Sequence, residues 1–331
     1  MRGKVRIWEM NPEEFRRALK EKPIVYLALG SLEFHGPQNP LGLDALKIQP
    51  LLEEVAEEEG GVVLPPLFWG TKSGHTYYPG SLLLREDTLS HLLIDTGEAL
   101  KSQGVRVFLG VSGHCPLPQV RVLEKVNQHF QEDPAIRVLL IRDWVLEEEE
   151  GMGIHQPLSD HGGSAETSHL LSLRGELVNL KSLPPSLNQP LWGLEGRDPR
   201  FSSPEYGEEI REALLKAIKK RVTRLLSDIR PLPPVKGKGT LKVKFRNKDK
   251  FKGWIKENLE KAYLLLLRPG GGVYRKAPLP PSLEVVFSDI PPGTYGVILW
   301  GIRKKKPLGY LSGPYREEIK VRENEEKEIL L

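Results

Sequence analysis

The sequence predicts an α/β protein with a mostly parallel sheet covered by helices, followed by a small C-terminal antiparallel β-sandwich. The first observation behind this prediction is that apolar, strand-like runs alternate with helical patterns over the first 150 residues. The second is the Pro- and Gly-rich stretch PLPPVKGKG, after which short alternating runs joined by turns replace the helices. We therefore expect a main domain at residues 1–230, a linker at 231–239 and an accessory domain at 240–331.

The elements follow in a regular order. Strands buried on both faces read as nearly continuous apolar runs, and the main domain contains four of them, at residues 23–30, 61–67, 105–111 and 135–144. Helical patterns occupy residues 44–60, 85–104 and 116–131, then about 166–174 and about 204–227. In the accessory domain, strands are predicted at residues 240–245, 262–269, 282–287, 294–302 and 316–321.

Composition bounds the function classes. The 331 residues, with 39% hydrophobic and 28% charged, are ample for a packed core. The single cysteine, Cys115, excludes an internal disulfide framework and a zinc site made of cysteines alone. No apolar run approaches the roughly 18 residues of a spanning helix, and the first residues lack the apolar core of a signal peptide. We expect no membrane association and a cytoplasmic location.

Charge is unevenly distributed. Residues 236–331 hold 21 Lys and Arg against 11 Asp and Glu, although the whole chain has a net charge of only +4. A basic domain of this kind could meet nucleic acid or another anionic surface. Its charges are scattered rather than clustered, so an ordinary solvated surface is the favoured interpretation and nucleic-acid binding is not expected.

Polar side chains collect where the predicted strands end. Glu33 and His35 follow the first strand, and Asp44 opens the next helix; His114 follows the third strand. Asp160, His161 and Glu166 lie beyond the fourth. Open parallel sheets bind ligands beyond the carboxyl ends of their strands, so these groups could meet in one cleft.

Carboxylates and imidazoles in one cleft suit zinc, manganese or iron, and a carboxylate can bridge two such ions. Such a centre activates a bridging water for hydrolysis. The alternative is that each group is structural, with Asp44 as a helix cap and His114 as a hydrogen-bonded core residue. Spacing alone leaves both interpretations open.

Four segments resemble the signatures of the creatininase (creatinine amidohydrolase) family, in order along residues 20–228. LALGSLEFHGPQNPLGLDAL is similar to the pattern G-S-x-E-Q-H-G-P-H-L-P-L-G-T-D, and SGHTYYPGSLLLREDTL to the family's second signature. SDHGGSAETS resembles D-H-A-G-x-x-E-T-S, and GRDPRFSSPEYGEE resembles the segment before the last helix. The C-terminal β-domain lies outside this resemblance.

The resemblance implies a role for each matched residue. It implies two divalent metal ions, zinc and/or manganese or iron, with Asp44 as the bridge between them. The implied ligands are Glu33, His35, Asp44, His114 and Glu166. Glu166 could instead handle protons beside the ions, and His161 would relay a proton to the leaving nitrogen. His75 and Ser81 would line the substrate side, although a polar-capped turn explains them equally well. Asp160 could orient a ligand or cap the following turn.

The sequence departs from the family pattern around the third histidine. Members usually have N-G-H-G-G-N or N-G-H-x-E-N, whereas residues 112–117 read SGHCPL. Pro116 replaces any acidic group two residues after His114, so creatinine is not the expected substrate. Cys115 could be a soft ligand, a reactive thiol on the substrate side or, more commonly, a small buried residue.

Two functions of different classes remain. The first is a metal-dependent amidohydrolase that cuts a non-peptide C–N bond of a small cyclic amide or formamide, with processing of a peptide cofactor or deformylation of a pterin precursor as variants. The second is a catalytically altered, creatininase-like binding protein. The resemblance also implies a homo-oligomer, possibly a hexamer. All candidate ligands precede the linker, so the β-domain is expected to modulate the activity rather than to carry it.

Overall fold

The computed structural model describes the chain except residues 1–3, 151–159, 187–191, 233–235, 247 and 304–309. It forms two compact units, Met1–Pro231 and Leu232–Leu331. Residues 233–235 of the predicted linker therefore lie outside the described residues. Within the part of the chain that the structure describes, every helix is too short or too polar to span a lipid bilayer.

A four-stranded parallel sheet organises the first unit, as predicted. Its strands are β1 (Ile24–Leu29), β2 (Val62–Val63), β3 (Val107–Ser112) and β4 (Arg137–Arg142), in the order β2-β1-β3-β4. All three pairings are parallel. The chain leaves β1 toward β2 and then crosses to β3 on the other side, so the strand order switches direction at β1. Open sheets bind their ligands at such a switch.

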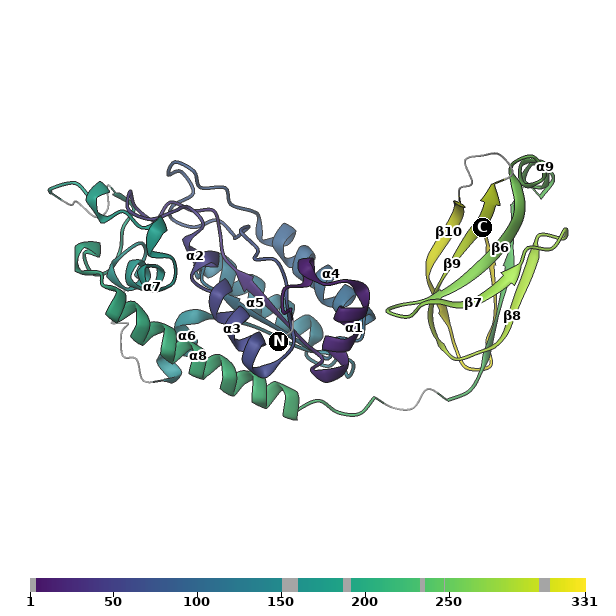
Figure 1. The fold of residues 1–331 in the computed structure, drawn as a ribbon, viewed down its shortest axis with the longest axis horizontal. Coiled ribbons are helices and arrows are strands. Elements are labelled where there is room, and N and C mark those ends of the chain that lie inside the picture. Colours follow the sequence, from purple (N-terminus) through teal and green to yellow (C-terminus); the bar gives the residue numbers. More distant parts are fainter. Residues whose placement is uncertain (1–3, 151–159, 187–191, 233–235, 247, 304–309) are drawn as a thin grey trace. The chain divides into compact units, whose positions relative to one another are not determined.

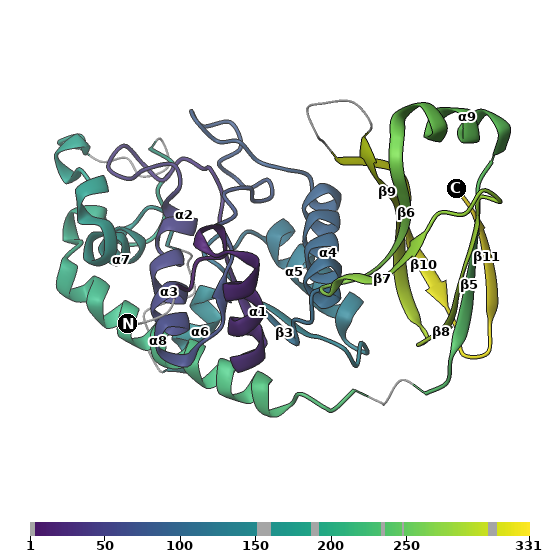
Figure 2. The ribbon, with the colours of Figure 1, turned by 45° about the vertical axis from the view of Figure 1, so that its right-hand side comes forward.

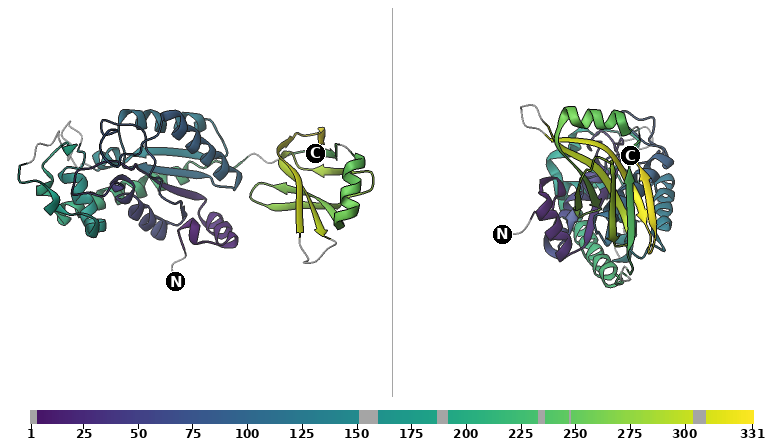
Figure 3. Two further views of the ribbon diagram at one scale, coloured as in Figure 1. Left: turned by 90° about the horizontal axis from the view of Figure 1, so that it is seen from above. Right: turned by 90° about the vertical axis from the view of Figure 1, so that its right-hand side faces the viewer.

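Helices cover both faces of this sheet. They are α1 (Pro12–Glu21), α2 (Leu43–Leu46), α3 (Gln49–Glu59), α4 (Glu86–Ser102), α5 (Leu117–Phe130), α6 (Asp143–Glu149), α7 (Ser164–Arg174) and α8 (Pro204–Ser227). Alternate residues of β1 separate two cores. Tyr26 packs with residues of α3 and α8, whereas Leu27 packs with residues of α4 and α5. Figures 1 and 3 show these layers on opposite sides of the strands. The alternation of strand and helix patterns thus gives a layered α/β fold.

One predicted helix is divided. Residues 44–60 form α2 and α3 rather than one helix, and the axis breaks at Lys47 and Ile48. Pro50 lies at the start of α3, where its missing N–H costs no hydrogen bond, but its ring prevents the preceding turn from continuing smoothly. The break separates Asp44, on α2, from the long apolar face of α3.

The second unit is a β-domain with two sheets. One has the order β10-β9-β6-β7, from β6 (Leu259–Arg268), β7 (Gly272–Pro278), β9 (Gly293–Arg303) and β10 (Tyr310–Val321). The other has the order β11-β5-β8, from β5 (Gly239–Lys244), β8 (Glu284–Ile290) and β11 (Glu326–Leu330). β11 pairs with β5 in parallel, so the unit is antiparallel in all but one pairing. An additional helix, α9 (Lys248–Asn258), lies at one end of the strands (Figure 2).

Candidate metal centre

The carboxyl ends of three parallel strands bring the polar groups together. β1 leads into the loop that carries Glu33 and His35, β3 leads to His114, and β4 ends directly before Asp143, the first residue of α6. Asp44 comes from the short helix α2, close above the end of β1. Glu33, His35, Asp44 and His114 are all buried, with at most 3% of their surface exposed. Burying so many ionisable groups is costly unless they are paired or bind a cation.

The first cluster consists of Glu33, Asp44 and His114. His114 Nδ1 lies 3.0 Å from Glu33 Oε2 and 3.1 Å from Asp44 Oδ2. The other ring nitrogen, Nε2, lies 2.9 Å from the carbonyl oxygen of Thr71, an acceptor that fixes a proton on Nε2. Nδ1 of neutral His114 therefore presents a lone pair to two carboxylates. Three donors converge on one point, as a cation requires.

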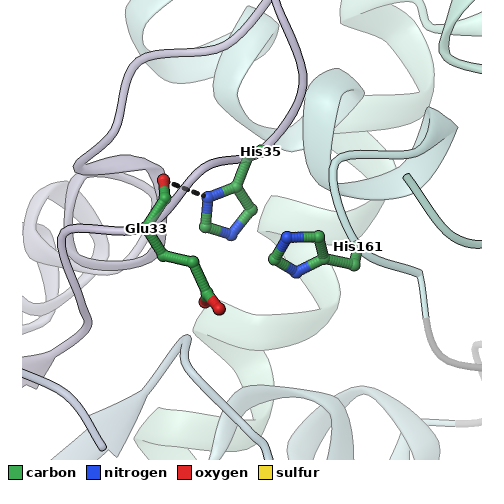
Figure 4. Close-up of side chains that lie close together, drawn as sticks. All are labelled: Glu33, His35 and His161. Atoms are coloured by element: carbon green, nitrogen blue, oxygen red, sulfur yellow. Dashed lines mark hydrogen bonds between the residues drawn. The ribbon is translucent and has the colours of Figure 1, made fainter. Parts of the chain in front are cut away.

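The second cluster consists of His35, Asp44 and Glu166. His35 Nε2 lies 3.0 Å from Asp44 Oδ1 and 3.8 Å from Glu166 Oε2. His35 Nδ1 lies 3.0 Å from the backbone oxygen of Glu33, which holds a proton on that nitrogen (Figure 4). His35 Nε2 is buried without a hydrogen-bond partner. A buried ring nitrogen that faces two carboxylates fits a metal ligand.

Asp44 belongs to both clusters. Its Oδ1 faces His35 and its Oδ2 faces His114, so the carboxylate spans the two candidate positions. Ser31 Oγ donates to Oδ2 at 2.6 Å and so fixes the orientation of the carboxylate. Within each cluster the donor atoms lie within 4.8 Å of one another. Nitrogen and carboxylate oxygen donors in these numbers suit zinc, manganese or iron.

The electrostatics of the metal-free centre support this fit. Burial alone would lower the pKa of His35 and of His114, but the carboxylates outweigh burial. The Asp44 and Glu166 charges raise the pKa of His35 to about 9, and hydrogen bonds to Asp44 and Glu33 raise that of His114 to about 10. Burial would raise the pKa of Asp44, yet the two histidines lower it well below its ordinary value. Protons thus hold the places that a metal cation would take.

His161 reaches the centre from the loop before α7. Its backbone pairs with that of Glu195, and its Nε2 lies 2.8 Å from the carbonyl oxygen of Phe34. The next residue, Gly162, has φ +59°, and a Cβ there would lie 2.6 Å from the backbone oxygen of His35. Only glycine allows this close approach. The His161 ring stacks between those of His35 and His75, at centroid distances of 4.2 and 3.7 Å. Figure 4 shows the stacked His35 and His161 rings beside the Glu33 carboxylate.

The charge state of His161 follows from this position. Burial, and to a smaller extent the charge of His35, lower the pKa of His161 to about 4. The ring is therefore neutral near pH 7. Since Nε2 donates to Phe34, Nδ1 carries the lone pair and can accept a proton. Atoms of Glu33, His35 and His161 also lie within 4.8 Å of one another, so a role as ligand is open to His161 as well.

Asp160 and Glu166 are fixed by the first turn of α7. Asp160 accepts the backbone N–H groups of Ala165 at 3.0 Å and Glu166 at 3.4 Å, and thereby caps the helix. Burial and the Glu166 charge raise the pKa of Asp160 to about 7. Glu166 Oε2 accepts the N–H of Gly162 at 2.8 Å. These bonds tie the His161 loop to the start of α7.

Only some of the residues predicted to contact substrate line the cavity beside the clusters. A cavity of about 740 Å³ extends from the clusters, and His75, His161 and Cys115 line it. Ser81 is not among its lining residues; its hydroxyl accepts the N–H of Phe34 at 3.2 Å. Burial and the Asp143 charge raise the pKa of the Cys115 thiol well above its ordinary value, so it stays protonated. A protonated, buried thiol is a weak nucleophile.

Sequence reasoning missed three partners of the centre. Ser73 Oγ donates to Glu33 Oε1 in a short hydrogen bond. Lys47 is only 4% exposed, and its ammonium pairs with Asp143 and Glu166. Burial would lower the pKa of Lys47, but these carboxylates raise it well above its ordinary value, so Lys47 is charged. Asp143 follows a strand directly, so the strand-end rule that selected His114 could have found it. A lysine within the apolar run DALKIQPLL was the signal for Lys47.

Comparison with known proteins supports the resemblance. Residues 8–222 match the family model "Creatininase: Creatinine amidohydrolase". Over 180 residues the chain is 27% identical to 3-dehydro-scyllo-inosose hydrolase of Thermotoga maritima, which covers 51% of this chain and 56% of that protein. Over 182 residues it is 28% identical to creatinine amidohydrolase of Pseudomonas putida, and this alignment covers 47% of this chain and 66% of that protein. The chain thus spans less than two thirds of each of these relatives.

A solved creatininase structure superposes on the first unit with a TM-score of 0.57 at 24% identity, over 69% of this chain and 99% of that one. Other solved creatininases include a Zn–Zn form and an Mn form, both with a TM-score of 0.57 at 23% identity, over 67% of this chain and 98% of theirs. These likenesses confirm the predicted fold class. The family match covers well over half of the chain, and the remainder is the C-terminal β-domain. The chain therefore belongs to the creatininase family.

Proposed function

We propose that the protein is a metal-dependent hydrolase that cuts a C–N bond other than a peptide bond, in a small cyclic amide or a formamide. The observation that carries this proposal is the convergence of two donor clusters on the shared carboxylate of Asp44. When bound there, two divalent ions would supply Lewis acidity for the amide carbonyl and an activated water.

In this proposal Glu33, Asp44 and His114 would hold one ion, and His35, Asp44 and Glu166 would hold the other. The surrounding residues keep these ligands in place. Ser31 and Ser73 donate to the carboxylates, and the carbonyls of Thr71 and Glu33 hold the ring protons away from the ions. Ligands oriented in this way need little rearrangement when metal binds.

His161 is the proposed proton carrier. Its ring is neutral near pH 7, its Nδ1 lone pair is available, and it lines the cavity beside Glu33. A neutral imidazole can take a proton from the attacking water and deliver it to the leaving nitrogen. With its low pKa, His161 is a weak base for accepting the proton, but a protonated His161 is a strong acid for delivering it to a basic nitrogen.

Substrate size and shape follow from the cavity. Its volume of about 740 Å³ is ample for a small amide, and its wall includes Cys115 and Pro116 at the start of α5. Proline removes both a backbone donor and conformational freedom there. We therefore propose a substrate other than creatinine, with a C–N bond placed beside His161 and Glu33. A homo-oligomer, possibly a hexamer, is part of the same proposal.

A screen of cyclic amides and formamides tests this function. Protein loaded with Zn²⁺ or Mn²⁺ should hydrolyse at least one compound with release of an amine, and chelator-treated protein should not. His161→Gln serves as the variant, because it keeps a hydrogen-bonding side chain but cannot carry a proton. It should lose at least about 100-fold in kcat with little change in KM. Equal activity of wild type and His161→Gln would contradict the proposed proton carrier.

The alternative is a creatininase-like protein that binds a small molecule without cutting it. The replacement of the family's usual residues by Cys115 and Pro116 favours this candidate. It predicts full metal loading and saturable binding of an amide with no turnover. Isothermal titration with any compound that fails to react in the screen distinguishes the two candidates.

A further inference from the structure

Lys47 is a buried cation beside the proposed second metal position. It follows Asp44 by three residues at the end of α2, it is 4% exposed, and it lines the same cavity as Glu33 and His114. Lysine is almost never this deeply buried unless it is paired. Its place is fixed from several sides, since Gly113 lies so close that a Cβ there would meet Lys47 Cε at 2.8 Å.

The ammonium is held between two carboxylates. Lys47 Nζ lies 2.9 Å from Asp143 Oδ2 and 2.6 Å from Glu166 Oε1. Asp143 is itself oriented, because the backbone N–H of Trp144 and the thiol of Cys115 donate to its Oδ1. Lys47 is thus a buried ammonium held in place by an oriented carboxylate, Asp143, and it differs in this from a mobile surface lysine.

The two candidate metal positions differ in this respect. Among the described residues, no lysine or arginine forms an ion pair with Glu33 or Asp44, the carboxylates of the first cluster. In the second cluster, Glu166 already gives Oε1 to Lys47 and accepts the Gly162 N–H at Oε2. A cation at the second position must share Glu166 with an ammonium and approach that like charge in a medium that screens it poorly.

We propose that Lys47 makes the two metal positions unequal. The Glu33–Asp44–His114 position fills first, and the His35–Asp44–Glu166 position binds its ion at least tenfold more weakly, because Lys47 competes for Glu166. Lys47 is then a positioning residue that sets the order and the stoichiometry of metal loading. This inference rests on the metal centre of the proposed function.

The test measures metal binding, not activity. Full-length metal-free protein is titrated with Mn²⁺ or Zn²⁺ against a competing chelator at pH 7.5, for wild type and for Lys47→Met, which keeps an unbranched side chain one atom shorter and removes its charge. The wild type should bind a first ion at least tenfold more tightly than a second. Lys47→Met should tighten the second position at least tenfold and change the first by less than threefold.

Two further variants keep the result interpretable. Lys101→Met is the matched control, because Lys101 also lies between two carboxylates, at 2.6 Å from Glu98 and 2.8 Å from Asp133, but away from the centre. It should leave both affinities unchanged. If Lys47→Met fails to fold, the double variant Lys47→Met/Asp143→Asn replaces it, since it also removes the charge that Lys47 leaves unpaired.

The outcomes separate this inference from the proposed function. Two equal positions in the wild type, or an unchanged second position in a folded Lys47 variant, overturn the role of Lys47 but leave the metal centre standing. No bound metal at either position in wild type and variants alike overturns both. Unequal affinities in the wild type that become similar in Lys47→Met support both the role of Lys47 and the metal centre.

Discussion

The two units of this protein bury different kinds of side chain. In the first unit, histidines, carboxylates, a lysine and several hydroxyl groups are almost entirely buried, and all of those described precede residue 170. In the second unit, the described buried side chains are apolar, with Tyr295 as the most polar among them. An apolar core such as that of the second unit stabilises the folded state through burial alone. Buried ionisable groups destabilise the folded state unless an opposite charge or a metal ion lies beside them. The buried ionisable groups of the first unit gather at the candidate metal centre, where a bound cation would offset their desolvation.

The two units also differ in the residues that follow their strands. In the first unit, β1 and β3 end before loops that carry Glu33 and His114, and β4 ends directly before Asp143 at the start of α6. In the second unit, the strands end in turns such as PPGTYG, and salt bridges such as Lys242 with Glu284 lie at the surface. Exposed ion pairs contribute little stability. Chemistry is thus expected in the first unit only.

The largest effect is expected from Asp44, the shared carboxylate. Asp44→Ala removes a donor from both clusters, so metal content should fall at both positions and turnover by more than the 10–100-fold that outer partners of a metal cost. Elemental analysis and kcat/KM check this. Asp133→Ala, which breaks an ion pair on the far side of the unit, is the control. Full metal content in Asp44→Ala would show that Asp44 is not a ligand.

A core substitution in the second unit should act on stability without touching the centre. Leu264 is fully buried in the β-domain core. Leu264→Ala should lower the free energy of unfolding of this unit by about 2–5 kcal/mol. Chemical denaturation followed by Trp fluorescence measures this, and metal content should stay at the wild-type value. Loss of metal from Leu264→Ala would mean that the two units are energetically coupled.

Metal binding should release protons. His35 and His114 have pKa values raised to about 9 and about 10 in the metal-free centre, so both are protonated at pH 7.5. A metal ion takes the lone pair of each, so filling both positions should release about one proton per histidine. Affinity should rise as pH increases from 7 toward 10 and level off above. Calorimetry in buffers of different ionisation enthalpy measures the protons; release of none would contradict this assignment.

The same pKa shifts determine how the free energy of unfolding of the metal-free protein changes with pH. Histidines with a raised pKa contribute stability that is complete below about pH 6.5 and is lost as pH rises through 9 to 10. His161 acts in the opposite sense, because its pKa is lowered to about 4, and its contribution is lost as pH falls from 6.5 to 4. Metal-free protein should therefore be more stable near pH 7 than at pH 10 or pH 4.

The smallest effect is expected from removing the second unit. A chain ending at Pro231 keeps every candidate ligand and both cores of the first unit. It should retain metal content and turnover within about threefold of the full chain, because the donors of the clusters found among the described residues all come from the first unit. If metal and fold persist while turnover is lost, the β-domain contributes to substrate binding.

Much of the fold could be predicted from the sequence because local patterns decide it. The parallel strands of the first unit are nearly continuous apolar runs, and α8 begins at Pro204 and ends at Ser227, as its helical pattern predicts. Long-range pairing is harder. The parallel pairing of β11 with β5 joins segments about 80 residues apart, and no local pattern specifies it. The short helix α9 was also missed, although Phe251 and Ile255 recur at helical spacing and pack on the core.

The candidate site divides in the same way. Glu33, His35 and Asp44 are close in sequence and carry a recognisable motif, so they could be selected before the fold was known. Lys47 and Ser73 could not, because a lone lysine or serine is ordinary until its carboxylate partners are placed beside it. The pairing of Lys47 with Glu166 joins residues 119 positions apart. The break between α2 and α3 decides this contact, and it depends on packing rather than on helical pattern.

Elemental analysis of the purified protein measures whether the two donor clusters around Asp44 bind metal. Metal-free protein is reconstituted with Zn²⁺, Mn²⁺ or Fe²⁺, freed of excess metal by gel filtration and measured for metal per chain. We expect at least one tightly held ion per chain, a second at higher metal concentration, and loss of both in Asp44→Ala. Less than one ion per chain with every metal, or the same content in wild type and Asp44→Ala, would contradict this expectation.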